Sequence, residues 1–188
     1  MRIIAGNHKG RKIFEPIDKE TRPLKDLTKE SIFNILEHSK NVKISIKKSN
    51  VLDLFSGAGS FGLECISRGA TKVYFIERHK PSIKILTKNI EKLNCEKKIS
   101  LFCKNAFDLN EIKKIRENKF NIIFLDPPYK EKNIILLLNE INEMNILIDK
   151  GIIVLHRHKK SVDNFGNKFK ILRTESYGIS KVIFGKFN

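Results

Sequence analysis

The tetrapeptide Asp126-Pro-Pro-Tyr129 brings a carboxylate, two rigid prolines and an aromatic ring together. These groups suit methyl transfer to an exocyclic amine of a nucleobase, a poor nucleophile whose lone pair is delocalised into the ring. Two acceptors aimed at the amine hydrogens, the Asp126 carboxylate and the Pro127 carbonyl, favour a pyramidal nitrogen with an available lone pair. The prolines would fix these acceptors, and the base would stack on Tyr129. An ordinary strand-ending turn is the alternative interpretation.

A second group of residues forms a glycine-rich loop. The segment Asp53–Gly62 contains G-x-G-x-x-G, with its first two glycines at Gly57 and Gly59, and Phe55 lies just before them. The loop follows a strand-like run and opens a helical pattern, which is the context that nucleoside-binding loops require. Phe55, Gly57 and Gly59 are therefore candidate cofactor-binding residues. The motif by itself fits a dinucleotide as well as other nucleoside cofactors.

Two carboxylates narrow the choice of cofactor. Asp53 lies in the first predicted strand close to the loop, where its charge would repel a phosphate and attract an ammonium. S-adenosylmethionine carries an ammonium and a sulfonium and no phosphate, so Asp53 favours it. Glu77 ends the next predicted strand about 20 residues further on, where a carboxylate can accept ribose hydroxyls of either cofactor. Asn105-Ala106 would flank the adenine, and a turn-forming Asn is the alternative.

The elements that position these groups alternate between strand and helix patterns. Helical repeats cover Phe61–Arg68, residues 83–93 and residues 134–141, with a weaker one near residues 112–115. Five short apolar runs are typical of strands buried on both faces. These runs are Val51–Phe55, Lys72–Glu77, Ile99–Cys103, Phe120–Asp126 and Gly151–His156. The pattern predicts an α/β fold with a parallel sheet, in which the glycine loop and Asp126 meet at the carboxyl edge.

The N-terminal part of the chain departs from this alternation. Arg2–Ala5 and Lys12–Glu15 flank a Gly-Asn-His-Lys-Gly segment, which predicts a basic β-hairpin. A helix follows, with Asp26 or Thr28 as its N-cap.

The C-terminal part predicts two further strands, Phe169–Thr174 and Ser180–Phe187, joined by a short link. Such a hairpin would make the sheet mixed. We expect a single domain over residues 1–188, with the basic hairpin and helix within residues 1–40 and the cofactor-binding core within residues 50–188.

Composition and charge limit the function classes. The 188 residues include 37 Lys and Arg against 21 Asp and Glu, a net charge of +16. The excess lies in residues 1–50 and 151–188, with some in residues 51–100, whereas residues 101–150 are balanced. A nucleic-acid partner would explain this distribution, and a lysine-rich composition from an AT-rich genome is the alternative. A hydrophobic fraction of 40% excludes general disorder.

The number and spacing of the cysteines and histidines do not predict a disulfide framework or a metal site. Cys65, Cys95 and Cys103 are odd in number and form no C-x-x-C pair, which favours a reducing compartment. His156 and His158 alternate on the fifth predicted strand and would face one side, but further ligands are not evident. A solvated or RNA-facing strand end is the preferred interpretation. The sequence shows no signal peptide or membrane-length apolar run, so we expect a cytoplasmic protein.

With these residues in hand, the chain resembles class I S-adenosylmethionine-dependent methyltransferases of the amino-methylating branch. It is similar to the bacterial RsmD family, which methylates N2 of a guanine in small-subunit ribosomal RNA. Asp126-Pro-Pro-Tyr129 together with the N-terminal elements is the specific part, since the tetrapeptide alone also occurs in adenine-N6 DNA methyltransferases. Departures are Leu24-Lys25, Lys29 in place of a common Arg, and the basic end of the fifth strand, often acidic in the family. The matching segments are residues 2–11, 22–23, 29–34, 53–70, 77, 105–106, 126–129 and 177–178.

The resemblance implies a Rossmann-like, seven-stranded mixed sheet with helices on both faces and an N-terminal β-hairpin extension that helps to hold RNA. It implies target-amine contacts at Asp126 and Pro127 and base stacking on Tyr129. It further implies cofactor contacts at Asp53, Gly57, Gly59, Glu77, Asn105 and Ala106. Candidate phosphate contacts are Arg2, Lys9, Arg11, Lys12, Arg22 and Lys25.

The resulting expectation is a metal-free, monomeric enzyme that uses S-adenosylmethionine to methylate ribosomal RNA, within the small subunit or its precursor. Three alternatives remain at this point. A DNA adenine-N6 methyltransferase shares the tetrapeptide but would normally need a larger recognition domain. A non-catalytic RNA-binding assembly factor would tolerate loss of Asp126 but not of the basic residues. A nicotinamide oxidoreductase is disfavoured by Asp53 and by the tetrapeptide.

Overall fold

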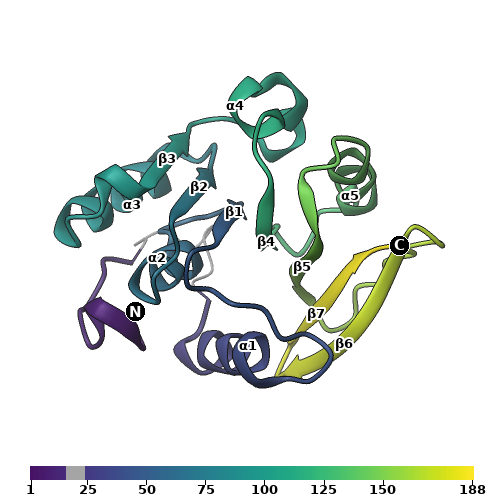
Figure 1. Ribbon diagram of the computed structural model, residues 1–188, viewed down its shortest axis with the longest axis horizontal. Coiled ribbons are helices and arrows are strands. Elements are labelled where there is room, and N and C mark those ends of the chain that lie inside the picture. The colour runs from purple at the N-terminus through teal and green to yellow at the C-terminus, as the bar shows by residue number, and fades with distance from the viewer. Residues whose placement is uncertain (16–23) are drawn as a thin grey trace.

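The computed structural model describes residues 1–15 and 24–188, and its centre is one seven-stranded sheet (Figure 1). The strand order is β3-β2-β1-β4-β5-β7-β6. Strands β1 to β5 run parallel, and β7 is antiparallel to both β5 and β6. The mixed sheet expected from the sequence is thereby confirmed. The strands are β1 (Asn50–Leu54), β2 (Lys72–Ile76), β3 (Ile99–Phe102), β4 (Phe120–Leu125), β5 (Leu147–His158), β6 (Phe169–Tyr177) and β7 (Ser180–Phe187).

Helices cover both faces of the sheet. The first three α-helices share one hydrophobic core with the sheet, and the later helices share the other. The first group is α1 (Asp26–His38), α2 (Ser60–Ser67) and α3 (Lys80–Lys92). The second group is the 3-10 helix η3 (Ala106–Glu111), α4 (Lys113–Arg116) and α5 (Ile134–Glu143). Two short 3-10 helices, η1 (Gly6–His8) and η2 (Glu96–Lys98), complete the set among the described residues.

The central strands are apolar at nearly every position because both of their faces are covered. In β4, Ile122 and Phe124 enter the core beneath α1, α2 and α3, whereas Ile123 and Leu125 enter the core beneath α5. Alternate side chains therefore serve opposite cores, and the strand is apolar from Ile122 to Leu125, directly before Asp126.

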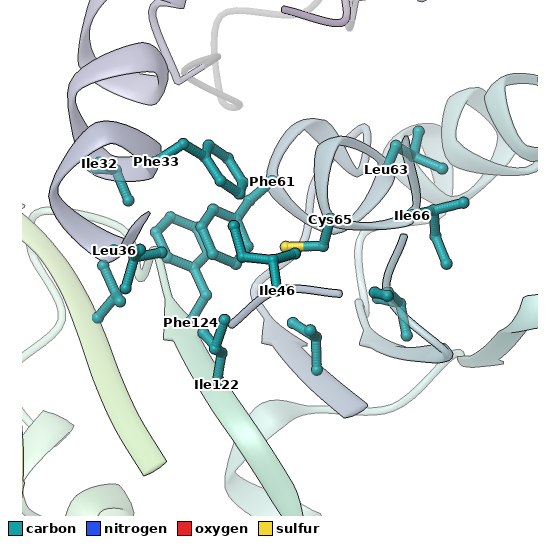
Figure 2. Packing of buried hydrophobic residues seen from close by; sticks show 14 of the residues in the cluster. Ile32, Phe33, Leu36, Ile46, Phe61, Leu63, Cys65, Ile66, Ile122 and Phe124 are labelled. Atoms are coloured by element: carbon teal, nitrogen blue, oxygen red, sulfur yellow. The ribbon is translucent and has the colours of Figure 1, made fainter. Parts of the chain in front are cut away.

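A stack of three phenylalanines ties the N-terminal helix to the elements that carry the glycine loop and Asp126. Figure 2 shows Phe33 of α1, Phe61 of α2 and Phe124 of β4 lying ring against ring. Their centroids are 5.0 Å apart between Phe33 and Phe61 and 4.0 Å apart between Phe61 and Phe124. All three side chains are buried. Ring pairs of this kind are worth about 0.5–1.5 kcal/mol beyond area burial.

The N-terminal segment forms an antiparallel hairpin as predicted, but its pairing is short. The arms pair at a bridge between Arg2 and Lys12, where the Ile3 N–H donates to the Arg11 carbonyl at 2.9 Å and the Ile13 N–H to the Met1 carbonyl at 3.1 Å, and η1 lies between the arms. The segment also packs on α2. Gly6 has a φ of +80°, and a Cβ added there would lie 1.9 Å from the carbonyl oxygen of Ser67. Only glycine satisfies both the backbone conformation and this close approach.

The start of α1 and the length of β5 also differ from expectation. The N-cap of α1 is Lys25, without a side-chain cap, and the prediction that Asp26 or Thr28 caps the helix is wrong. Asp26 is the first helical residue, where its charge favours the helix N-terminus, and it lies near Arg2 and Lys29. Strand β5 begins at Leu147, four residues before the predicted start. No helix within residues 1–15 and 24–188 is long and apolar enough to cross a membrane.

Candidate functional site

A cavity of about 380 Å³ opens at the carboxyl ends of the central strands. Strands β1 and β4 are neighbours there although β2 and β3 lie between them in sequence, so the cavity sits where the strand order reverses. Its volume is in the range of small-molecule sites. Four loops supply most of the wall, namely residues 55–58 after β1, 76–79 at the end of β2, 104–106 after β3 and 126–131 after β4. Met1, Leu24 and His156 complete it.

The glycine loop turns sharply through left-handed conformations. Phe55 has a φ of +58°, rare for an aromatic residue, and its ring packs edge-on against Phe107 with centroids 5.9 Å apart. Gly59 is the N-cap of α2 with a φ of +81°, and a Cβ added there would lie 2.4 Å from Leu86 Cδ1. Phe55 and Gly57 line the cavity, whereas Gly59 lies behind its wall. Gly59 therefore shapes the turn, and a direct cofactor contact by this residue stays a prediction.

Glu77 connects the glycine loop to the loop that follows β2. Its Oε2 accepts the Gly57 N–H at 2.7 Å, and its Oε1 accepts the N–H groups of Arg78 and His79, both at 2.8 Å. A carboxylate offers about four acceptor positions, so these bonds leave room for one more donor, on Oε2. Glu77 also lines the cavity. It thus holds both loops, and its contact with ribose hydroxyls stays a prediction.

Asp53 lies beneath the glycine loop and does not line the cavity. Its Oδ2 accepts the Gly62 N–H at 2.9 Å, and its Oδ1 is buried without a partner among the described residues. Burial raises the pKa of the Asp53 carboxyl well above its usual range. The hydrogen bond from the Gly62 N–H lowers this pKa, whereas the charges of Asp126 and Glu77 raise it further. Asp53 therefore holds the start of α2 against β1, and its contact with a cofactor stays a prediction.

Asn105 acts as the turn-forming residue that one interpretation of the sequence suggested, and its place beside an adenine stays a prediction. Its Oδ1 accepts the Phe107 N–H at 3.4 Å and so caps η3, as a turn-forming Asn would. Asn105 and Ala106 also line the cavity. Because Oδ1 is the acceptor in the cap, the side-chain amide hydrogens are the donors that Asn105 can offer to a ligand.

Asp126 follows β4 directly and lines the cavity together with Pro127, Pro128 and Tyr129. Its side chain is 20% exposed, and its Oδ1 lies 2.8 Å from Nδ1 of His156. Pro127 is buried. The structure thus brings the predicted catalytic residues to the cavity that the glycine loop and Glu77 also line.

The two histidines of β5 share one side of the strand, as expected, but only one is solvated. The rings of His156 and His158 both meet Tyr129 edge-on, with centroids 6.1 and 5.1 Å from it. His156 is buried, so its interpretation as a solvated or RNA-facing residue is wrong. The parallel register places it beside Asp126, because Leu125 pairs with Leu155 and the following residues are Asp126 and His156.

The candidate phosphate contacts lie on the N-terminal segment and at the start of α1. Arg22 falls outside the described residues. The other five, Arg2, Lys9, Arg11, Lys12 and Lys25, are exposed. Arg2 also has a partner in the fold, since its Nε lies 3.8 Å from Oδ2 of Asp26. In sequence, Arg2 and Lys25 directly follow Met1 and Leu24, which are part of the cavity wall.

Three buried polar side chains anchor this segment, a role that sequence reasoning did not assign to them. Glu64 of α2 accepts the N–H groups of Ile4 and Ala5 at 2.7 and 2.9 Å. Lys29 of α1 donates to the Arg2 carbonyl at 2.7 Å and to Ser60 Oγ at 3.1 Å. Asn89 of α3 accepts the Phe14 N–H at 2.7 Å.

Two of these side chains, Lys29 and Asn89, also connect the segment to the glycine loop. Ser60 directly follows that loop, and Asn89 Nδ2 donates to the Ala58 carbonyl at 3.0 Å as well as to the Phe14 carbonyl at 3.1 Å. Burial lowers the pKa of Lys29, and the charges of Glu64 and Asp26 oppose this. The basic segment and the cavity wall thus share their supports.

Cysteines and acidic residues form no further site in the part of the chain that the structure describes. Cys65 and Cys95 are buried, Cys103 is exposed, and all three are free thiols. No group of three or more His, Cys, Asp or Glu residues there has the geometry to hold a metal ion.

Comparisons with known proteins agree with this geometry. The family described as "Conserved hypothetical protein 95" matches residues 1–186. The protein named "Putative rRNA methyltransferase YlbH" from Bacillus subtilis is 33% identical over 99% of this chain and 98% of its own length. Ribosomal RNA small subunit methyltransferase D from Buchnera aphidicola is 33% identical over 84% of this chain and 78% of its own.

Among solved structures, "Putative methyltransferase yhhF" from Escherichia coli superposes with a TM-score of 0.80 at 24% identity, covering 100% of this chain and 97% of its own. This likeness supports the fold, and the sequence matches extend over nearly the whole chain. The chain therefore belongs to the "Conserved hypothetical protein 95" family, the RsmD family that its motifs resemble.

Proposed function

We propose that this protein transfers a methyl group from S-adenosylmethionine to the N2 amine of a guanine in small-subunit ribosomal RNA. The observation that carries the proposal is the position of Asp126, which lines the same cavity as the glycine loop and Glu77. Relatives of the same family are named ribosomal RNA methyltransferases, which supports RNA as the substrate class.

The chain offers groups that fit S-adenosylmethionine. Glu77 has acceptor capacity left for a ribose hydroxyl, and Asn105 brings amide donors to the part of the wall expected to flank the adenine. The buried Oδ1 of Asp53 has no partner among the described residues, which fits a site that a cationic ligand completes. When bound, the cofactor supplies a methyl group already activated by its sulfonium, so no strong base is needed from the protein.

Asp126, Pro127 and Tyr129 would prepare the target amine. The Asp126 carboxylate and the Pro127 carbonyl accept one amine hydrogen each, which keeps the nitrogen lone pair out of the ring and directed at the methyl group. Tyr129 stacks on the base, which must leave its own stack to reach the cavity. Asp126 is then also the acceptor nearest to the proton that the nitrogen releases after transfer.

Replacement of Asp126 tests the catalytic part of the proposal. For Asp126→Ala we expect methyl transfer to fall by about 100-fold or more, because the amine loses its charged acceptor, while the dissociation constant for S-adenosylmethionine stays within about three-fold of the original. The measurement combines a labelled-methyl assay with calorimetric titration of the cofactor. Asp149→Ala, at an exposed position of β5, is the matched control and should retain activity. Full activity of Asp126→Ala would rule out the assigned role. Absence of transfer by the original chain would instead favour a non-catalytic RNA-binding protein.

A further inference from the structure

The end of β5 holds the Asp126–Glu131 loop at both of its ends. Parallel pairing of Leu125 with Leu155 brings Asp126 beside His156, and His156 Nδ1 lies 2.8 Å from Asp126 Oδ1. At the other end of the loop, Arg157 Nη2 donates to the Glu131 carbonyl at 2.9 Å. Two consecutive residues of one central strand thus fix the loop that carries the candidate catalytic groups.

The Arg157 contact is itself rigid. Arg157 donates two hydrogen bonds to Asp163, from Nε at 3.1 Å and from Nη2 at 2.9 Å, and both side chains are almost fully buried. Within the loop, the Glu131 N–H donates to the Pro128 carbonyl at 2.8 Å and closes a turn. Asp126 is therefore the first residue of a loop whose backbone is already determined, and the rotation of its carboxylate is the freedom that remains.

The contact with His156 removes that freedom. A carboxylate offers only acceptors, so Nδ1 of His156 carries the hydrogen and donates to Oδ1. Rotation of an aspartate carboxylate about its last torsion is otherwise broad. With Oδ1 tied to a buried ring, Oδ2 becomes the oxygen that Asp126 directs at an amine in the cavity.

The ring of His156 is enclosed where it meets Asp126. Its Nε2 is buried and has no partner within the described residues. The ring meets Tyr129 edge-on, and His156 pairs with Val182 of the neighbouring strand β7. The contact between Nδ1 and Asp126 Oδ1 is therefore the hydrogen bond that the structure gives this side chain.

We propose that His156 is a positioning residue that sets the orientation of the Asp126 carboxylate for the target amine. This role rests on the proposed function of Asp126. The role also explains why a histidine stands at the end of β5, where the chain departs from the family's pattern of an acidic residue.

The test compares two replacements of His156 with a matched one of His158. His156→Leu removes the donor and keeps an apolar side chain, whereas His156→Asn retains an amide donor close to the place of Nδ1. His158→Leu is the control, because His158 meets the same Tyr129 ring but bonds through Nδ1 to the Lys160 N–H instead of to Asp126. Each variant is measured for kcat and KM with RNA, for cofactor affinity and for thermal unfolding.

We expect His156→Leu to lower kcat about 10- to 100-fold, with KM and cofactor affinity within about three-fold of the original. His156→Asn should recover most of that loss, and His158→Leu should keep kcat within about three-fold. In an Asp126→Ala background, His156→Leu should cause no further loss, because the group that it orients is absent.

Failure of this inference and failure of the proposed function are distinguishable. If Asp126→Ala is inactive but His156→Leu keeps the kcat of the original chain, only the positioning role is contradicted. Equal losses in His156→Leu and His156→Asn would also contradict it, because the donor would then not matter. If His156→Leu does not fold, His156→Asn is compared with His156→Gln, whose amide lies further along the side chain, and equal kcat values would overturn the role. An active Asp126→Ala overturns the proposed function itself.

Discussion

Asp53 carries a carboxyl group that the fold buries completely between the glycine loop and the sheet. Burial raises its pKa, and because the unfolded chain has the ordinary value of 3.8, the folded protein keeps this proton to a higher pH. The stability that the proton provides is complete below pH 3.8 and is lost as the pH rises through the folded pKa. A buried carboxylate under the loop is therefore a cost at neutral pH, which a positively charged ligand would offset.

We expect Asp53→Asn to remove this pH dependence. The amide oxygen can still accept the Gly62 N–H, but the side chain cannot ionise. Relative to the original chain, the variant's free energy of unfolding should increase above pH 3.8 by about 1.4 kcal/mol for each pH unit until the folded carboxyl ionises. Urea unfolding at a series of pH values measures the difference. Parallel stability curves for the two proteins would show that Asp53 does not titrate as its burial requires.

At the scale of elements, the N-terminal segment is held by side chains from three helices in addition to the short pairing of its own arms. Glu64 of α2, Lys29 of α1 and Asn89 of α3 are each buried, and each bonds to the backbone of residues 1–15. Since Lys29 and Asn89 also bond to Ser60 and Ala58, movement of the segment would disturb the glycine loop.

Lys29→Met tests this arrangement. The change keeps the bulk of the side chain but leaves Glu64 and the Arg2 carbonyl without the buried cation. We expect the free energy of unfolding to fall by about 3 kcal/mol, with faster amide hydrogen exchange at Ile4 and Ala5. Lys40→Met, at an exposed position after α1, should change stability by less than about 0.5 kcal/mol. Unchanged exchange at Ile4 and Ala5 would mean that Lys29 does not hold the segment.

The elements differ in how far the sequence predicts them. Strand β4 begins and ends within one residue of the prediction, because an unbroken apolar run followed by Asp-Pro is a local signal. The antiparallel arms of the N-terminal hairpin were predicted, but their anchoring was not, because the amides of Ile4 and Ala5 bond to Glu64, about 60 residues away. His156 combines a predictable and an unpredictable feature. The alternation of side chains along β5 predicts that His156 and His158 face the same side, but only the pairing of β5 with β4 reveals the contact of His156 with Asp126.

For the whole molecule, the distribution of charge agrees with a large polyanionic substrate. The net charge of +16 includes the exposed cations of the N-terminal segment, which continues into the cavity wall at Met1. A base flipped into the cavity would leave its flanking phosphates near these cations, and phosphate contacts of this kind position nucleic acids. The fold thus brings the ends of a basic segment, at Met1 and Leu24, to a cavity that Glu77 and Asp126 also line.

The most direct test of this account is methyl transfer from labelled S-adenosylmethionine to unmodified small ribosomal subunits, free ribosomal RNA and duplex DNA, with the product nucleoside identified by mass spectrometry. We expect N2-methylguanosine in the ribosomal RNA, and its absence from a reaction with Asp126→Ala. N6-methyladenine in the DNA would contradict the RNA substrate while retaining the role of Asp126. Binding of the cofactor without transfer to any of the three substrates would contradict the central claim.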